Sequence, residues 1–417
     1  MEVFHDLQGR IMYDLQGRIM AKNPIPSIDL EHENKYFPPT YPTGTRGNTR
    51  FTTQDENEIY IDFGDGSPIY TEVFSGSLNF LGESLYEYDT IERRTVKIWF
   101  KYPERIIQIA IAWQYYIGNF PLNIGLYSLT QFSVQQTRFE EFPINFLGGV
   151  FSRITIRNIT QQTIYSIPAW IINSRIQNLS LHGGIELDND ATDSIENLMD
   201  IQDLETLSLA DTKITDIPSN FKDKDTLKRL FLGNNPFTEI TQNVNDCKKL
   251  IELSFGYHGG GYWTAGGSDL FTSWGVGIAN MPELQVFRFD SMHQAPDTLP
   301  TGIETAPKCK TIWARTYRTQ QRQDIFIENV YNQVISTATM ATGEGILRRT
   351  TLRIETRSGG SALRPSGIYQ APSGYVQGSS NGNPSSAMEM IYVLVNQYEW
   401  ILYLTDEAGT GVEILTP

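Results

Sequence analysis

The chain has 417 residues, a length at which one hydrophobic core usually gives way to two or three domains. Its apolar and aromatic contents of 40% and 12% can fill such cores, which excludes a disordered or collagen-like protein. Acidic residues outnumber basic ones 48 to 33, and the resulting formal charge of -15 disfavours nucleic acid as a partner. Since no apolar run approaches the ~20 residues of a membrane helix, we also expect no membrane insertion.

The first 47 residues are predicted to be a docking tail followed by a proline-rich, extended linker. An octapeptide is repeated directly at 5–12 and 13–20, and two such short copies cannot bury a face by themselves. The tail therefore has two interpretations, a segment that docks on another protein or an ordinary frayed terminus. In the docking interpretation the contact residues are Leu7, Arg10, Ile11, Leu15, Arg18 and Ile19.

The next segment, 48–102, is predicted to be a small β-sandwich. Ile59–Phe63 and Thr95–Phe100 alternate as strands should, and glycines follow the first of them. The turn Asp62-Phe63-Gly64-Asp65-Gly66 resembles the Asp-x-Gly-Asp-Gly signature of PKD-type domains, which implies an immunoglobulin-like fold. Asp62 and Asp65 are either calcium ligands or acceptors of hydrogen bonds within the turn.

The range 103–318 carries one recurring pattern, an apolar anchor followed by apolar residues three and five positions later. The anchors are Ile106, Leu129, Phe151, Ile176, Leu204, Leu227, Leu250, Leu284 and Cys309. Their spacing runs from 22 residues (Leu129 to Phe151) to 34 residues (Leu250 to Leu284). The pattern is identified as a leucine-rich repeat, most plainly at 227–235, where Asn235 stands at the position that turns the chain. It predicts an α/β solenoid with a long parallel sheet.

In each predicted strand the middle residue must point away from the solenoid core. Small hydroxyl residues occupy this outward face in the early copies, and large or cationic residues occupy it in the later ones. The later candidates are Arg229, Phe231, Arg288, Trp313 and Arg315. On an acidic protein they form a basic, aromatic patch of the kind found at interfaces. The patch has two interpretations, a ligand-binding surface or a solvated sheet face without a ligand.

The longest interval places about eleven extra residues in a loop at 256–267 that is rich in glycine and aromatic residues. We expect this loop and the tryptophan that follows it to contact a sugar or peptide; the candidates are Tyr257, His258, Tyr262, Trp263 and Trp274. Alternatively, Trp263 and Trp274 fold back over the convex side as a lid. A second insertion ends at Asp193, which is predicted to cap a helix over 194–199 rather than to bind calcium.

The last segment, 319–417, is predicted to be a terminal repeat and an α+β cap. Helical spacing at 324–335 precedes a strand at 352–354, a long irregular loop at 361–384, a second helix that ends near Asn396 and a last strand at 400–404. The end of a solenoid must be covered, which is the expected role of this segment.

The sequences at 365–378 (PSGIYQAPSGYVQG) and 391–398 (IYVLVNQY) resemble the endings of repeat proteins from Bacteroides-type anaerobes and their phages, including crAss-like phages. This resemblance implies surface recognition and no catalytic residues. Cellular relatives usually begin with an export or lipoprotein signal, and the first residues here lack that pattern. We therefore expect a protein made in the host cytoplasm and incorporated into the virion.

Together these features predict a non-enzymatic phage virion protein, a tail fibre or a related tail component. Its expected partners are other tail or portal-vertex proteins at the N-terminus, a host-surface glycan or protein at the repeat face, and further copies of itself. A bacterial surface adhesin is the alternative. A glycan depolymerase is disfavoured because no carboxylate pair is tied by spacing to a second catalytic feature.

No metal and no cofactor is expected. The five histidines are scattered without a metal-ligand or nucleophile motif. The two cysteines, Cys247 and Cys309, are also outside metal-ligand spacing, and both are expected to be small buried hydrophobic residues.

Overall fold

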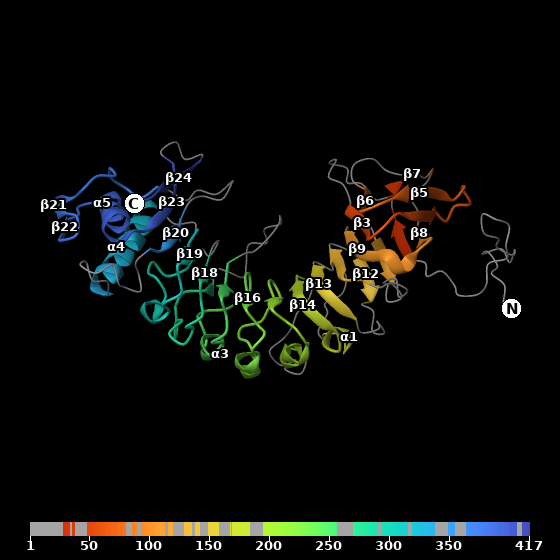
Figure 1. Cartoon of the computed structure of the whole chain (residues 1–417), viewed down its shortest axis with the longest axis horizontal. Helices are drawn as coiled ribbons and strands as arrows, with labels where there is room; N and C mark the ends of the chain where they lie inside the picture. Colours follow the sequence, from red (N-terminus) through yellow and green to blue (C-terminus); the bar gives the residue numbers. More distant parts are fainter. Residues whose placement is uncertain are drawn as a thin grey trace. The chain divides into compact units, whose positions relative to one another are not determined.

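The computed structural model describes residues 28–33, 36–37, 48–80, 86–87, 89, 93–112, 116–119, 129–135, 138–141, 149–157, 167, 169–183, 195–256, 270–289, 294–315, 319–337, 349–354, 364–406 and 411–417. Within those ranges no helix combines the length and apolar character needed to cross a membrane. The chain divides into two compact units, which are described separately. Unit 1 comprises 1–152, 159–162 and 168–170, and unit 2 comprises 153–158, 163–167 and 171–417 (Figure 1).

Unit 1 is built from two layers of strands. The first layer contains, in spatial order, β12 (Arg138–Glu141), β10 (Tyr116–Asn119), β1 (Ile28–Glu33), β8 (Arg93–Phe100), β4 (Asn57–Asp62) and β5 (Tyr70–Phe74). The second contains β6 (Ser77–Phe80), β3 (Asn48–Thr53), β9 (Ile106–Ala112) and β11 (Gln131–Gln135). Phe51 of the second layer meets Phe100 of the first with ring centroids 5.1 Å apart, and both rings are fully buried. The alternating apolar residues of the predicted sandwich thus form a shared core.

Part of the range predicted as an extended linker is a strand. β1 pairs antiparallel with β8 along its whole length, from Ile28↔Ile98 to Glu33↔Arg93, and the Ile28 side chain is fully buried. A short pair, β2 (Tyr36–Phe37) and β7 (Tyr86–Glu87), joins the same two regions. The prolines that suggested a linker flank these strands in the sequence, so they are compatible with an extended linker and with a strand. The octapeptide copies and their six candidate contact residues lie outside the described residues.

The predicted calcium candidates are explained by turn geometry. Asp62 Oδ1 accepts a hydrogen bond from the Gly64 N–H (2.9 Å), and Asp65 Oδ1 accepts one from the Ser67 N–H (3.0 Å). Gly64 has a φ of +79°, and a Cβ there would lie 2.4 Å from the Thr95 carbonyl oxygen. In the described ranges no group of three or more His, Cys, Asp or Glu side chains is placed to hold a metal ion.

The first repeat copies belong to unit 1. A 3-10 turn, η1 (Pro103–Arg105), leads into β9, which pairs antiparallel with β3 and parallel with β11. The repeat strands therefore continue a layer of the sandwich, with no separate sheet beginning at the boundary expected after residue 102. The next strand, β13 (Val150–Arg157), contains the division between the two units.

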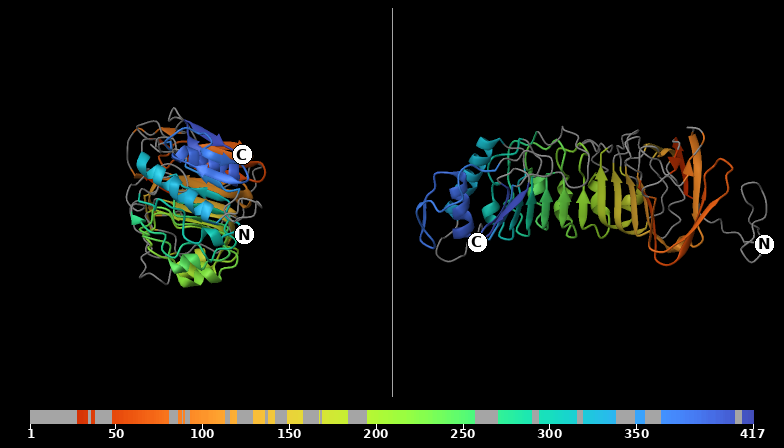
Figure 2. Two further views of the ribbon diagram at one scale, coloured as in Figure 1. Left: turned by 90° about the vertical axis from the view of Figure 1, so that its left-hand side faces the viewer. Right: turned by 90° about the horizontal axis from the view of Figure 1, so that it is seen from above.

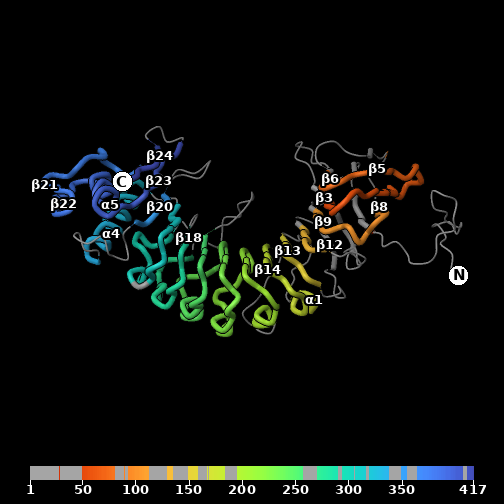
Figure 3. The backbone as a smooth tube through the Cα atoms, in the orientation of Figure 1, coloured from red at the N-terminus to blue at the C-terminus, as the bar shows by residue number. Residues whose placement is uncertain are grey.

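Unit 2 is dominated by a long parallel sheet. Its strands, in both chain and spatial order, are β14 (Arg175–His182), β15 (Thr206–Ser208), β16 (Arg229–Phe231), β17 (Glu252–Ser254), β18 (Val286–Arg288), β19 (Thr311–Trp313), β20 (Thr351–Arg353) and β23 (Ile401–Thr405), followed by the antiparallel β24 (Val412–Leu415). Figure 2 shows these strands side by side, and Figure 3 shows the backbone of the same region as successive coils. The prediction of a repeat-based α/β fold with a parallel sheet is confirmed.

The strand register explains why the repeat pattern folds this way. One ladder runs through the central apolar residue of each short strand, Leu207, Leu230, Leu253, Phe287, Ile312, Leu352 and Leu402, and all are fully buried. Each of these side chains adds roughly 1.5–3 kcal/mol when it leaves water, so the ladder contributes substantially to the stability of the sheet. The predicted strand is present in every one of the anchored copies.

Among the described residues, short helical segments lie in the connections between the strands. They are α1 (Ala169–Ile172), η3 (Asn197–Asp200), η4 (Ser219–Asp223), α3 (Gln242–Asn245) and η6 (Ile303–Thr305). The predicted 194–199 helix corresponds to the short helical stretch that ends in η3, and its predicted cap Asp193 lies outside the described residues.

The two long helices, α4 (Gln320–Thr337) and α5 (Ala387–Tyr398), pack against each other near the C-terminal end of the sheet. Ser386 caps α5 by accepting a hydrogen bond from the Glu389 N–H (3.3 Å). The Glu389 carboxylate accepts a hydrogen bond from the Ser385 N–H (2.7 Å), and this bond, with those from the Gln370 and Ser385 side chains, lowers the pKa of the carboxyl. The helix predicted to begin after Ser385 or Ser386 is confirmed.

The stretch predicted as a long irregular loop contains a hairpin. β21 (Ser373–Val376) and β22 (Ser380–Asn383) pair antiparallel, and Asn381 Nδ2 donates to the Tyr398 hydroxyl at the end of α5 (3.0 Å). Gly374, Gly378 and Gly382 all have positive φ, which is why a glycine-rich sequence can make this compact turn.

Both cysteines are buried, at 3% exposure for Cys247 and 1% for Cys309, as predicted. Burial is the main cause that raises the pKa of each thiol to about 12. We expect neither to react with a thiol reagent at about pH 8 in the folded protein, because the thiolate is the reactive form. Mass spectrometry after labelling should find both modified only when denaturant is present; labelling of either in the native protein would contradict this burial.

A candidate binding face on the parallel sheet

One column of outward side chains runs across the sheet of unit 2. It follows from the pairing register and contains Ser180, Ser208, Phe231, Ser254, Arg288, Trp313, Arg353 and Tyr403. Each comes from a different strand and stands next to its neighbour at a strand spacing of about 4.8 Å. The predicted change from small hydroxyls to large cationic and aromatic groups is therefore a change along one continuous surface.

The cationic part of the column is centred on Trp313. The guanidinium carbons of Arg288, Arg315 and Arg353 lie 4.0, 4.2 and 4.3 Å from the centroid of its ring. Arg353 also lies 4.2 Å from the Tyr403 ring centroid. Contacts of this kind each contribute about 0.5–2 kcal/mol and hold both partners in one orientation. The cations are thus fixed on the sheet before any ligand arrives.

The Glu252 carboxylate joins this cluster to the strands on its N-terminal side. Glu252 lies 3.0 Å from Arg288 Nε and 3.6 Å from Arg229 Nε. The Arg288 and Glu252 side chains are each 15% exposed, whereas Arg229 is 44% exposed and can more easily turn toward a ligand. We call this set the Arg–Trp ladder; it consists of Arg229, Glu252, Arg288, Trp313, Arg315, Arg353 and Tyr403.

The Arg–Trp ladder contains four of the five residues predicted for the sheet face. The fifth, Phe231, is 6% exposed, and its column neighbours Ser208 and Ser254 are 7% and 1% exposed. This part of the face is closed to solvent, so the prediction of Phe231 as a contact residue is wrong. Protein interiors are close-packed, so a ring that is 6% exposed has almost no surface left for a ligand.

The prediction that Trp274 is a contact residue is also wrong. Its side chain is 6% exposed and lies among Phe271, Phe287 and Phe289, with ring centroids 5.5, 5.8 and 5.0 Å away. Its Nε1–H donates to the Thr298 hydroxyl (2.9 Å). Trp274 therefore packs in the core, which also differs from the alternative interpretation of a lid over the convex side. The other loop candidates, Tyr257, His258, Tyr262 and Trp263, lie outside the described residues.

Three members of the Arg–Trp ladder were not among the predicted contact residues: Glu252, Arg353 and Tyr403. The signal for two of them is present in the sequence. Arg353 lies between Leu352 and Ile354, and Tyr403 lies between Leu402 and Leu404, which is the same apolar-x-apolar pattern. Extending the column beyond Cys309 finds both. Glu252 is found only when the residue two positions before the column is placed on the same face.

At the other end of the column, a buried histidine satisfies the serine hydroxyls. His182 Nε2 lies 2.8 Å from Ser180 Oγ and 2.7 Å from Ser208 Oγ, and His182 is 5% exposed. The contact with Ser208 connects β14 to β15, whereas the contact with Ser180 lies within β14. Since His182 and Ser208 are both buried, their hydrogen bond stabilises the pairing of the two strands.

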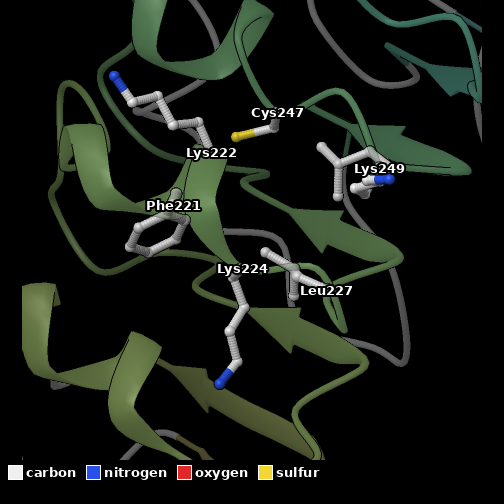
Figure 4. Close-up of a pocket in the computed structure, with 7 residues that line it drawn as sticks. Phe221, Lys222, Lys224, Leu227, Cys247 and Lys249 are labelled. Atoms are coloured by element: carbon white, nitrogen blue, oxygen red, sulfur yellow. The ribbon is translucent and has the colours of Figure 1, made fainter.

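A small pocket lies between the η4 and α3 connections. It is lined by Phe221, Lys222, Lys224, Leu227, Cys247, Lys249 and Leu250. Figure 4 shows the side chains of Lys222 and Lys224 extending in opposite directions. The Lys224 amine donates to the carbonyls of Met199 (2.7 Å) and Ile201 (2.6 Å) near the end of η3, and burial lowers its pKa. These lysines therefore do not converge on a common anion site.

Comparisons with known proteins find a structural similarity and no family match. No family model matches it, and no curated protein matches it. Among solved structures, it is similar to the leucine-rich-repeat ectodomain of the plant membrane receptor kinase GASSHO1/SCHENGEN3 from Arabidopsis thaliana, determined in complex with CASPARIAN STRIP INTEGRITY FACTOR 2. The identity is 16%, the match covers 47% of this chain and 28% of that one, and the TM-score is 0.25. The chain thus spans just over a quarter of that receptor structure.

Proposed function

We propose that the parallel sheet is the strand face of a leucine-rich-repeat solenoid. The hydrogen bonds of Asn235 support this. Its Nδ2 donates to the carbonyls of Leu209 (2.6 Å) and Leu232 (3.0 Å), and its Oδ1 accepts from the Thr212 N–H (2.8 Å). One side chain thereby satisfies backbone groups of two successive coils where the chain leaves the strand, which is what the repeat asparagine is expected to do.

The sandwich of unit 1 is proposed to be a PKD-like domain that leads into the solenoid. Two features of the turn explain why it has the sequence Asp-x-Gly-Asp-Gly. The carboxylates of Asp62 and Asp65 accept hydrogen bonds from backbone N–H groups within the turn, and Gly64 and Gly66 have positive φ. The observed layers add strands from 28–33 and from the first repeats to this sandwich.

The protein is proposed to be a non-enzymatic recognition protein of a phage tail that binds the host surface through the Arg–Trp ladder. The observation that carries this proposal is the pre-ordered row of Arg288, Trp313 and Arg353 on one sheet face. Side chains that are already held by cation–π contacts lose little conformational entropy when a ligand binds. A host glycan or protein with acidic and polar groups would suit this surface. The phage assignment and the N-terminal virion partners rest on the sequence resemblance.

The double variant Arg288→Ala/Trp313→Ala is expected to weaken binding to host cells at least about tenfold, because truncation of a central Arg or Trp anchor typically costs 2 kcal/mol or more. Binding of purified protein to host cells, measured by flow cytometry across a concentration series, checks this. Arg175→Ala is the matched control, since this β14 arginine is paired with Asp203 outside the ladder. Equal binding by the double variant and the control would reject the Arg–Trp ladder as the binding site.

A separate experiment distinguishes the tail protein from the bacterial adhesin. Antibodies raised against the chain should label purified phage particles at the tail in electron micrographs. Labelling of the bacterial envelope in phage-free cultures, with no label on particles, would instead favour the adhesin.

A further inference from the structure

The ring of Trp313 is covered by cations from both neighbouring strands. Trp313 lies on β19, and its register partners are Arg288 on the preceding strand β18 and Arg353 on the following strand β20. The guanidinium carbons of Arg288, Arg315 and Arg353 all lie within 4.3 Å of the ring centroid. A carbon atom that close stands over a ring face, because van der Waals contact keeps an atom in the ring plane farther from the centroid. The guanidiniums therefore occupy the surface on which a sugar or a nucleobase would stack.

This arrangement makes the Arg–Trp ladder suited to an anion. Its members carry four guanidiniums and one carboxylate, that of Glu252, so their own charges do not cancel. A guanidinium has five N–H donors, and its attraction to a ring face depends on its charge and not on those donors. Two N–H groups of one guanidinium match the two oxygens of a carboxylate. Trp313 is therefore a positioning residue, and the arginines that it holds provide the recognition.

The spacing of the arginines distinguishes between kinds of acidic polymer. Arg229 lies on β16, Arg288 on β18 and Arg353 on β20, so across the sheet they repeat at about 9.6 Å, two strand spacings. Side chains on one face of an extended peptide repeat at about 6.8 Å, which is a poor match. A polysaccharide in which acidic and neutral sugars alternate has its carboxylates close to the interval of the arginines, because two sugars separate one carboxylate from the next.

Hydroxyl side chains lie beside these cations on the same face of the sheet. Thr311 and Thr351 are register partners, and they precede Trp313 and Arg353 by two residues along their strands. Residues two apart on a strand point to the same side, and both threonines are half-buried. Each hydroxyl can donate and accept a hydrogen bond, which suits the hydroxyl groups of a neutral sugar.

We propose that the Arg–Trp ladder binds an acidic polysaccharide whose carboxylates alternate with uncharged sugars. Arg288 and Arg353 bind successive carboxylates, while Trp313 holds both guanidiniums in place. Thr311 and Thr351 bind the neutral sugar between them. The chain as a whole has a formal charge of -15, so outside the ladder it repels such a polymer and confines it to this face. This ligand class rests on the proposed function, in which the ladder is the binding face for the host surface.

The test measures binding of the full chain to hyaluronan, a polymer of alternating uronate and neutral amino sugar, by isothermal titration calorimetry. We expect saturable binding that weakens as salt is added, because ions screen exposed charges, and no binding to the uncharged polysaccharide dextran. Arg288→Gln/Arg353→Gln should weaken the affinity at least about tenfold. Arg175→Gln is the matched control, since Arg175 pairs with Asp203 outside the ladder, and it should bind like the wild type. Circular dichroism should show that both variants are folded.

A second pair of variants tests the positioning role of Trp313. Trp313→Phe keeps an aromatic face for the guanidiniums and should retain most of the affinity for hyaluronan. Trp313→Leu is also apolar but has no ring face, and it should weaken binding at least about tenfold. Equal affinities of these two variants would show that the ring does not position the arginines.

The remaining outcomes separate this inference from the proposed function. The absence of hyaluronan binding, or equal binding to dextran, would overturn the inference, even if binding to host cells still required the Arg–Trp ladder. Equally tight binding to poly-L-glutamate would overturn it in favour of an acidic protein ligand. Binding to hyaluronan through the ladder without any binding to host cells would support the ligand class and overturn the proposed function alone.

Discussion

Replacing Trp274 with alanine is expected to lower the free energy of unfolding by about 3–5 kcal/mol. The indole is 6% exposed and packs between Phe287 and Phe289, so its removal leaves a cavity in the core. It also leaves the Thr298 hydroxyl without the indole donor. Urea denaturation followed by circular dichroism measures the change, provided that unit 2 unfolds in a single transition.

Two controls separate this effect from a role in binding. Leu270→Ala removes a side chain that is 49% exposed near the same position, and it should change stability by no more than about 0.5 kcal/mol. Trp274→Ala should leave the affinity of the folded fraction for host cells unchanged, because the ring does not reach the surface. A loss of binding without a loss of stability would restore the contact role that the structure argues against.

Replacing Asn235 with alanine is expected to cost about 2–4 kcal/mol. Its amide connects two coils through the Leu209 and Leu232 carbonyls and the Thr212 N–H, and the residue is 3% exposed. Alanine leaves these buried groups without this partner, and an unsatisfied buried group costs about 1–3 kcal/mol. Thr212 Oγ1 still donates to the Leu209 carbonyl, which limits the loss. Thermal and urea unfolding report the change.

Asn220→Ala provides the comparison for this second result. Asn220 also donates to a carbonyl, that of Glu196 (2.9 Å), but the bond is exposed and water can replace it. We expect a loss below about 1 kcal/mol. Equal destabilisation by the two variants would mean that the asparagine bonds of Asn235 do not stabilise the junction between coils.

The sheet of unit 2 was predictable because its signal is local. In the segment 227–232, the spacing of Leu227, Leu230 and Leu232 predicts that these side chains are buried, and the same spacing recurs in the later coils. The register then follows, since a shift of one residue would expose every buried leucine. The same reasoning predicted that Arg288 and Trp313 lie side by side. Their cation–π distance of 4.0 Å came from the packing of the two side chains.

The burial of Ile28 and Trp274 could not be predicted from the sequence, because it depends on residues that are far away in the chain. Ile28 is buried because β1 pairs with β8, about seventy residues later, and a flanking proline-rich sequence does not reveal that pairing. Trp274 is buried because Thr298 and Phe289 provide a hydrogen bond and a ring contact. A glycine-rich neighbourhood favoured exposure, but the stabilisation from burying an indole outweighs that local tendency.

By itself, the sequence of this protein determined the repeat, the direction in which each apolar side chain points and the outward column that includes Arg288 and Trp313. Those properties depend on the alternation of side chains along single strands, which is set by the backbone of each strand alone. Only the tertiary structure decided that Phe231 and Trp274 are buried and that Glu252 pairs with Arg288. These outcomes depend on contacts between residues that are far apart in the sequence, and the local spacing of residues does not predict such contacts.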